Sequence, residues 1–160
     1  MSNKVVGNGG AAVAAYDSVS GSNRVSVVNQ ARFGDVTDVL VEETNLAVAT
    51  YYYPSSDGME IFGFNAGLGL TGELTQGTGT ITATIEETNA TSPSATDWID
   101  STQKWEGTDG QKGHASITVT AGSVYFNYSR SDDLNKKFRL KIVVGNATNT
   151  VKAYLTKKAK

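Results

Sequence analysis

The chain has 160 residues, a length that suits one domain, and it contains 17 glycines, two prolines, no cysteine and one histidine, His114. A sequence without cysteine has no disulfides, zinc–thiolate sites, iron–sulfur clusters or thiol catalysis, and one histidine cannot build a multi-histidine metal centre. The formal net charge at pH 7 is only −2, but this charge is unevenly distributed along the chain.

Residues 1–36 are rich in small residues and chain breakers, including the runs Asn8–Gly10 and Ala11–Ala15. The segment has few large apolar side chains, so by itself it buries too little apolar surface to offset the entropy lost on ordering. We therefore expect an extended N-terminal arm over residues 1–36, with a short strand at Arg24–Val28.

Residues 46–64 have the pattern of two strands around a turn. Leu46–Tyr53 is apolar and aromatic, and Met59–Phe64 is largely apolar again. Between them, Pro54–Gly58 has strong turn chemistry, because Pro presets φ and Gly accepts a positive φ. The pattern predicts a β-hairpin over residues 46–64.

Residues 77–85 alternate strictly between apolar residues and threonine. Ile81, Ala83 and Ile85 fall on one face, and the threonines fall on the other. A two-residue period of β-branched side chains is typical of a strand with one buried face.

Four further alternating runs follow in the second half of the chain, at residues 115–120, 124–128, 138–144 and 151–155. The last two runs are joined by a turn that begins at Gly145-Asn146, so they predict a hairpin over residues 138–156.

Short strands at a spacing of about 8–12 residues, without a periodic helical stretch, are typical of sandwiches and barrels. The sequence therefore predicts an all-β fold: an antiparallel two-sheet β-sandwich, jelly-roll-like, over residues 37–160, preceded by the extended N-terminal arm. A parallel α/β fold would need intervening helices, which the pattern does not supply.

Two motifs could suggest catalysis, and both have a simpler structural interpretation. Gly67–Gly72 matches a dinucleotide-binding glycine pattern, but a strand follows it where that motif needs a helix. His114 lies beside a polar turn, and no Gly-x-Ser-x-Gly elbow accompanies it. We therefore expect a protein that is not an enzyme, with no catalytic residues, no cofactor and no metal site.

The charged residues divide the chain into two parts. Residues 1–129 carry five Lys/Arg against fourteen Asp/Glu, whereas residues 130–160 carry nine Lys/Arg against two Asp. The split can produce attraction within one surface, attraction between copies of the chain, or a basic tail for an anionic partner. Because the acidic part would repel a polyanion, nucleic-acid binding is disfavoured and protein–protein complementarity is preferred.

Candidate interface residues come from the arm, the tyrosine run and the basic end. Alternation places Tyr52 on the face opposite Tyr51 and Tyr53, so one tyrosine face is expected at the surface, where Tyr is enriched in interfaces. Three basic residues of the predicted hairpin over 138–156 share its polar face. The full set is Arg24, Arg32, Phe33, Tyr51, Tyr53, Arg139, Lys141, Lys152 and Tyr154.

An alternative ligand-binding site involves Trp98 and Trp105, which have four carboxylates around them within residues 97–109. Paired carboxylates near aromatic rings are typical of sugar-binding and glycosidase clefts. An acidic loop between two strands has the same composition, and the sequence leaves open whether Trp98 is core or exposed. A carbohydrate-binding module is therefore the alternative function.

Three elements together resemble the β-sandwich virion proteins of tailed bacteriophages. They are the Thr-rich strand at 78–85, the pair Asp97-Trp98, and the closing strands Lys137-Phe-Arg-Leu-Lys-Ile-Val-Val and Asn149-Thr-Val-Lys-Ala-Tyr-Leu155. The resemblance covers about residues 60–157. Thr88–Thr96 stands where such proteins often carry an Asp-Gly turn before the Trp.

The resemblance implies a capsid decoration (cement) protein or another structural protein of the virion, assembled in the host cytoplasm. Its expected partners are the major capsid protein or other virion proteins, and further copies of the chain in a homo-oligomer. No run of the sequence approaches the ~20 apolar residues that a membrane span needs, so we expect no membrane contact.

Overall fold

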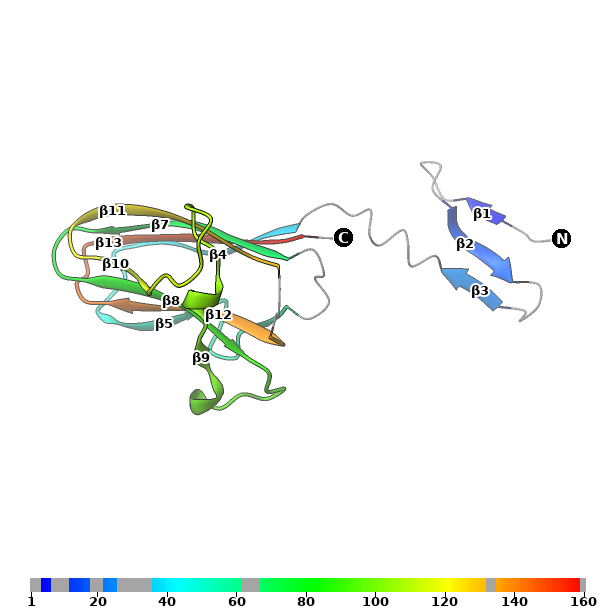
Figure 1. The fold of residues 1–160 in the computed structure, drawn as a ribbon, viewed down its shortest axis with the longest axis horizontal. Coiled ribbons are helices and arrows are strands. Elements are labelled where there is room, and N and C mark those ends of the chain that lie inside the picture. The colour runs from blue at the N-terminus through cyan, green and yellow to red at the C-terminus, as the bar shows by residue number, and fades with distance from the viewer. Residues whose placement is uncertain are drawn as a thin grey trace.

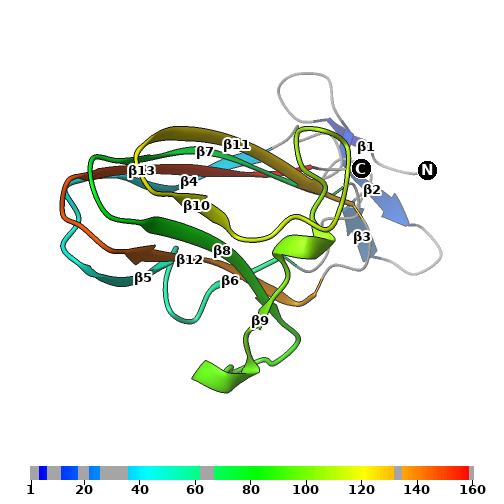
Figure 2. The ribbon, with the colours of Figure 1, turned by 60° about the vertical axis from the view of Figure 1, so that its left-hand side comes forward.

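The computed structural model describes residues 4–6, 12–17, 22–25, 36–61, 67–131 and 135–158. Residues from 36 onward form two antiparallel sheets that pack face to face, so the predicted all-β sandwich is confirmed (Figures 1 and 2). The first layer, sheet I, has the strand order β11-β7-β13-β4, and the second layer, sheet II, has the order β10-β8-β12-β5.

The strands of sheet I are β4 (Val36–Thr44), β7 (Leu68–Gln76), β11 (Gly122–Arg130) and β13 (Asn149–Lys157). The strands of sheet II are β5 (Ala49–Tyr53), β6 (Met59–Glu60), β8 (Ile81–Thr88), β9 (Ile99–Asp100), β10 (Ile117–Val119) and β12 (Lys137–Val144). The short strands β6 and β9 pair with β12 and β8, respectively.

The chain crosses from one sheet to the other at each of four turns, between β4 and β5, β7 and β8, β10 and β11, and β12 and β13. The two strands joined by each of these turns therefore lie in opposite layers, one over the other, rather than side by side. Eight strands in the orders given above form a jelly roll, in which the two sheets enclose one core.

The core follows directly from the two-residue period of the strands. On β8, Ile81, Ala83 and Ile85 are fully buried, whereas Thr82 and Thr84 are only partly buried on the other face, as predicted. The same alternation on the neighbouring strands completes the core with the fully buried residues Leu68, Leu70, Leu74, Phe138, Leu140, Ile142, Val151, Ala153 and Leu155.

The predicted hairpin over residues 46–64 is wrong. Strands β5 and β6 both pair antiparallel with β12 and lie end to end along it, with Tyr53 opposite Leu140 and Met59 opposite Phe138. Residues 54–58, which begin with a cis peptide bond at Pro54, thus loop out of a single interrupted edge strand. The turn residues were identified correctly, but they form a loop after which the chain continues along β12 in the same direction, instead of a turn that reverses the chain.

The predicted hairpin over residues 138–156 is also wrong. Strand β12 pairs with β8 and β5 in sheet II, whereas β13 pairs with β4 and β7 in sheet I. Both strands carry one fully apolar face, and burying both faces against each other requires the turn to cross between the layers. As a result, Arg139 and Lys141 lie on a different sheet from Lys152, and the three residues do not share one polar face.

Three strands precede the sandwich: β1 (Lys4–Val6), β2 (Ala12–Asp17) and β3 (Ser22–Val25). They pair antiparallel in the order β1-β2-β3 and form a sheet that includes no strand of sheet I or sheet II. The boundary of the arm at residue 36 stays a prediction.

Replacing Gly72 by Ala should destabilise the protein by about 1–3 kcal/mol, the usual cost of overpacking. A Cβ at Gly72 would lie 2.1 Å from the Lys152 carbonyl oxygen and 2.4 Å from the Phe126 ring. Gly69→Ala on the same strand is the matched control, because its Cβ would meet Thr156 Cβ at an ordinary 3.8 Å. Equal losses in urea denaturation at the two positions would contradict this packing.

Candidate functional site

The acidic and basic parts of the sequence meet on neighbouring strands of the sandwich. Strand β12 lies against β8, so that Arg139 is opposite Glu86, and β13 lies between β4 and β7, so that Lys152 is opposite both Glu42 and Glu73. The resulting ion pairs are Arg139 and Lys141 with Glu86, Lys152 with Glu73, Lys157 with Asp38, and Arg130 with Glu87. Attraction within one molecule therefore accounts for much of the charge split.

Arg139 is the centre of a cluster on the outer side of sheet II. Its Nε donates to Glu86 Oε2 at 2.7 Å, and one terminal nitrogen donates to the Ser56 carbonyl at 2.7 Å. The guanidinium lies between two aromatic rings, 4.1 Å from the centroid of Tyr52 and 4.1 Å from that of Trp98. With 5% of its surface exposed, Arg139 holds the fold together and offers little to a partner.

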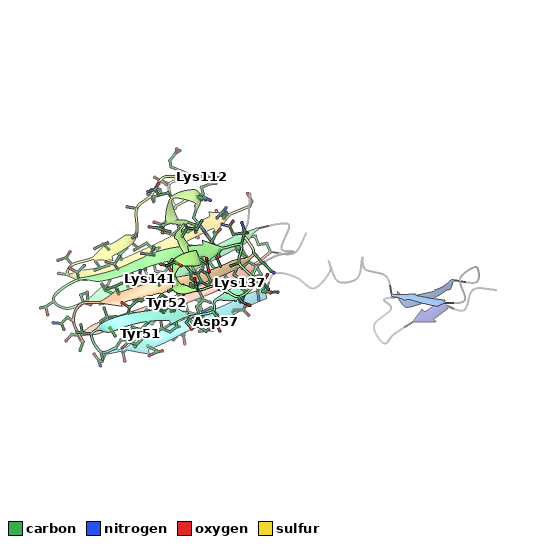
Figure 3. The ribbon with its side chains drawn as sticks, turned by 90° about the horizontal axis from the view of Figure 1, so that it is seen from below. Tyr51, Tyr52, Asp57, Lys112, Lys137 and Lys141 are labelled. Carbon is green, nitrogen blue, oxygen red and sulfur yellow. The ribbon has the colours of Figure 1, made fainter. Side chains whose placement is uncertain are left out.

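The loop over residues 54–58 completes this cluster from the edge of the sheet. Gly58 has φ +65°, and a Cβ there would lie 2.4 Å from the Trp98 ring and 2.6 Å from the Phe138 carbonyl oxygen. Only glycine accepts both the positive φ and this close approach. Figure 3 shows the face that carries Tyr52 and Lys141, which are cross-strand partners beside the cluster.

A second cluster lies on the inner side of β8, around Glu87. Glu87 is fully buried, and it accepts from Trp105 Nε1 at 2.8 Å, from Asn135 Nδ2 at 2.7 Å and from Arg130. The Trp105 ring is fully buried and packs 5.7 Å from the ring of Phe138. Every charged or polar group here has a partner, as burial of an ion pair requires.

The two tryptophans do not share a cleft. Glu86 and Glu87 are consecutive residues of β8 and face opposite sides of the sheet, so the rings that they help to position lie on opposite sides as well. Trp105 presents no ring face to a ligand, and Trp98, with 9% of its surface exposed, is covered by Arg139. The carbohydrate interpretation therefore finds no shared aromatic surface at these two residues.

The tyrosine run alternates as the sequence predicts. Tyr51 and Tyr53 are partly buried against the core and stack on each other, with centroids 6.4 Å apart and planes 14° apart, whereas Tyr52 contacts Arg139. Partial burial, and then the nearby carboxylate of Glu43, raises the pKa of Tyr53 to about 12. The phenol of Tyr53 is therefore neutral at physiological pH.

The remaining candidate interface residues are spread over separate surfaces. Tyr154 lies on the outer face of sheet I and donates its hydroxyl to Glu42. Arg24 is in β3, opposite Ala15 of β2. Arg32 and Phe33 lie outside the described residues. In the described part of the chain, the structure brings together Arg139 with Lys141, Tyr51 with Tyr53, and Lys152 with Tyr154, the last two beside Glu42 and Glu73.

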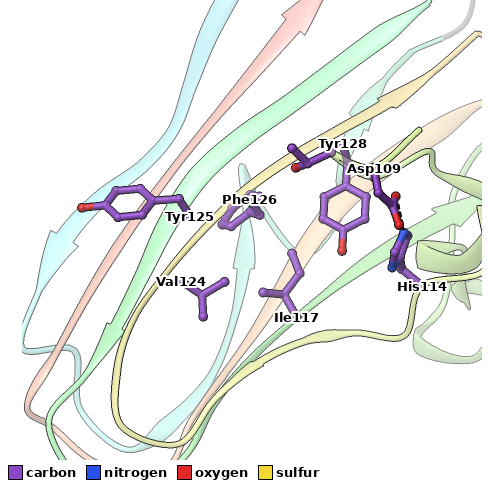
Figure 4. Close-up of a pocket in the computed structure, with 9 residues that line it drawn as sticks. Asp109, His114, Ile117, Val124, Tyr125, Phe126 and Tyr128 are labelled. Atoms are coloured by element: carbon purple, nitrogen blue, oxygen red, sulfur yellow. Dashed lines mark hydrogen bonds and ion pairs between the residues drawn. The ribbon is translucent and has the colours of Figure 1, made fainter. Parts of the chain in front are cut away.

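A pocket of about 220 Å³ lies at the open edge between β10 and β11 (Figure 4). Its walls include Ile117 from β10 and Phe126 and Tyr128 from β11, and the loop that carries Asp109 and His114 closes one end. The sequence interpretation took His114 as an exposed turn residue and did not find this pocket.

The polar end of the pocket carries one fixed carboxylate. Asp109 Oδ1 accepts from the Gln111 N–H at 3.1 Å and lies 2.9 Å from His114 Nε2. The Gln111 N–H, and then the hydrogen bond with His114, lower the pKa of Asp109, while partial burial raises the pKa of Tyr128. At neutral pH the pocket therefore presents an anionic carboxylate beside a neutral phenol.

Other kinds of site are not found in the described part of the chain. Its helices are 3-10 turns, and none has the length and apolar character of a membrane span. Within the same residues, no three His, Asp or Glu side chains gather into a set that could hold a metal ion.

Comparison with known proteins gives one structural neighbour to report. No protein-family model matches the chain, and no curated protein matches its sequence. A solved structure described as "Crystal structure of PBSX exported protein XepA" aligns with 17% sequence identity and a TM-score of 0.49. The alignment covers 99% of this chain and 49% of that chain, so this chain spans about half the length of XepA. At this level of likeness, the neighbour assigns no activity or partner.

Replacing Arg139 by Met should destabilise the protein by about 3–5 kcal/mol, because it leaves Glu86 poorly compensated in a buried position. Lys141→Met is the matched control, since Lys141 contacts the same carboxylate at 3.5 Å but is 34% exposed, and its loss should cost under about 1 kcal/mol. Urea denaturation measures both values. Similar small losses would show that Arg139 is not a structural centre.

The free energy of unfolding should fall between pH 10 and pH 12, because Tyr53 ionises near 10.0 in the unfolded chain and near 12 in the folded protein. Stabilisation from the raised pKa is complete below the lower value and is lost as the pH rises through the higher one. Tyr53→Phe should flatten this part of the profile in urea titrations across the same range. An unchanged slope in that variant would contradict the assignment.

Proposed function

We propose that this chain is a non-enzymatic structural protein of a virion, of the capsid-decoration type. It would bind the head lattice through its N-terminal arm and the outer surfaces of its sandwich, with the major capsid protein or further copies of itself as partners. The observation that supports this most is the separate sheet β1-β2-β3, which belongs to neither layer of the sandwich.

The size of this small sheet argues for a partner. Its strands have three, six and four residues, and small residues such as Ala12, Ala14 and Ala15 form its central strand. A sheet of this size is stable only if it can bury a hydrophobic face. A partner surface would provide that burial, and repeated copies on a lattice would strengthen the attachment through avidity.

The outer faces of the sandwich are also suited to contact. Hydroxyl groups pair across strands on both sheets, for example Thr75 with Ser123 at 2.7 Å and Thr84 with Ser116 at 3.0 Å. Exposed apolar and aromatic residues accompany them: 75% of Tyr125 and 61% of Val39 is exposed. Tyr enrichment and sparse unpaired charge are typical of the centre of protein interfaces.

The sequence resemblance to phage sandwich proteins supports the same class. The strand segments that carry it are β8, β12 and β13, adjacent or facing strands at the centre of the jelly roll, and the pair Asp97-Trp98 directly precedes β9. Binding through the faces of strands and through the arm requires no reactive side chain. The proposed role therefore agrees with the expectation that the protein is not an enzyme.

Ala14→Pro in the full-length chain should abolish attachment to the virion and leave the sandwich intact. Proline removes the backbone N–H of Ala14, which lies between Val5 and Val25 in the middle of the small sheet. Ala14→Val is the matched control, because valine favours strands. Co-sedimentation with virions of the phage that encodes the chain measures attachment, and near-ultraviolet circular dichroism reports the sandwich.

Two results would overturn the proposal in different ways. If Ala14→Pro co-sediments as well as the unmodified chain, the small sheet is not the attachment element. If mass spectrometry of purified virions does not detect the unmodified chain, it is not a virion protein.

A further inference from the structure

The side of the sandwich formed by β10 and β11 is open. These two strands end the strand orders of sheet II and sheet I, so in the described part of the chain each pairs with another strand on one side only. Strand β11 pairs with β7 along all nine of its residues, so its other edge is the unpaired one, apart from the contacts of its C-terminal end with residues 106–108. An unpaired edge is a template for another strand.

The chain already uses one end of this edge for pairing. Ser129 both donates to and accepts from the backbone of Glu106, at 2.8 Å in each direction. In an antiparallel strand, alternate residues point their backbone groups to the same side, so Asn127 and Tyr125 direct theirs to the same outer edge as Ser129. Thr108 Oγ1 donates to the Asn127 carbonyl at 3.4 Å, and no backbone–backbone hydrogen bond among the described residues joins this loop to Tyr125.

The pocket lies where a strand added at this edge would point its side chains. Val124, Phe126 and Tyr128 face the core side of β11, and they line the pocket together with Ile117. Alternate residues of an added strand would face the same side. At about 220 Å³ the pocket is smaller than the roughly 300–1,000 Å³ of a typical small-molecule site, so it suits a single side chain.

The negative charge at the end of the pocket favours a basic side chain at the next inward-facing position of such a strand. Asp109 is ionised at neutral pH and its side chain is 56% exposed, and His114 beside it is in edge contact with Tyr128, with ring centroids 6.0 Å apart. The same loop carries Glu106 and Lys112, so carboxylates outnumber lysines there. In the added strand, the residue two positions from the one that fills the pocket also points to the core side. A basic side chain at that position would reach Asp109 at the end of the pocket.

We propose that the β11 edge binds an extended peptide segment of a protein partner by strand addition. One aromatic or aliphatic side chain of that segment fills the pocket, and a Lys or Arg two residues away lies beside Asp109. This inference goes beyond the proposed function, because it assigns a docking site on the sandwich itself and does not depend on the small N-terminal sheet or on a capsid.

Two synthetic peptides test the recognition. The probe is acetyl-Thr-Lys-Thr-Phe-Thr-Lys-Thr-amide, which places a Lys two residues from the anchor in either strand direction, and the matched control carries Glu in place of both lysines. With isotope-labelled protein, the probe should shift the backbone resonances of Val124, Phe126 and Asp109, with a Kd on the order of 1 mM, a free energy of about −4 kcal/mol. The Glu peptide should bind at least about fivefold more weakly, as expected for the replacement of an attractive charge by a repulsive one.

Two pairs of variants locate the contacts. Val124→Trp should abolish binding by filling the pocket, whereas Val143→Trp, at a similarly exposed valine on sheet II, should not change it; the exposed fractions are 37% and 40%. Asp109→Asn should remove the preference for Lys over Glu in the peptide. Asp97→Asn, at another exposed aspartate, should preserve that preference.

The proposal is overturned if neither peptide shifts the β11 resonances at several times the expected Kd. It is also overturned if Val143→Trp weakens binding as much as Val124→Trp does, or if the Lys preference survives Asp109→Asn. These measurements involve no virion, so their failure would leave the proposed function standing, and loss of the virion proposal would not affect them.

Discussion

Two consecutive glutamates near the end of β8 impose the constraint on which much of the structure depends. Because neighbouring strand residues face opposite sides, Glu86 must find cations on the outer side of sheet II and Glu87 must find them on the inner side. Arg139 and Arg130 meet these needs from the basic end of the chain. Trp98 and Trp105 then attach the segment after β8 to both sides of the sheet.

This arrangement gives the uneven charge of the sequence a structural meaning. The carboxylates lie on strands from the earlier part of the sequence, and most of the basic residues lie on the last two strands. Each of these last strands lies between two earlier ones: β12 between β8 and β5, and β13 between β4 and β7. Opposite charges in these positions favour the correct neighbours and register over other pairings. The outer faces of the sheets carry Thr and Ser hydroxyls that pair across strands, such as Thr75 with Ser123 and Thr84 with Ser116.

The sequence predicted which residues are buried much better than it predicted which strands are neighbours. Alternation at Ile81, Ala83 and Ile85 reports a buried face directly, because the period of a strand is two. Alternation does not show whether the next strand in the sequence pairs with the first in the same sheet or faces it across the core from the other sheet. Both predicted hairpins were therefore wrong. The pocket near His114 was missed because edge strands and a loop form it together, and no local motif marks such a meeting.

The interruption between β5 and β6 has a consequence for the tendency of the protein to aggregate. A continuous edge strand opposite β12 would offer an uninterrupted row of backbone groups to any other exposed strand. The excursion at residues 54–58 breaks that row, and Gly58 and Trp98 anchor it in place. Edge-to-edge stacking through this edge of sheet II is thereby hindered, while β11, at the other end of sheet I, keeps an unpaired edge in its N-terminal half.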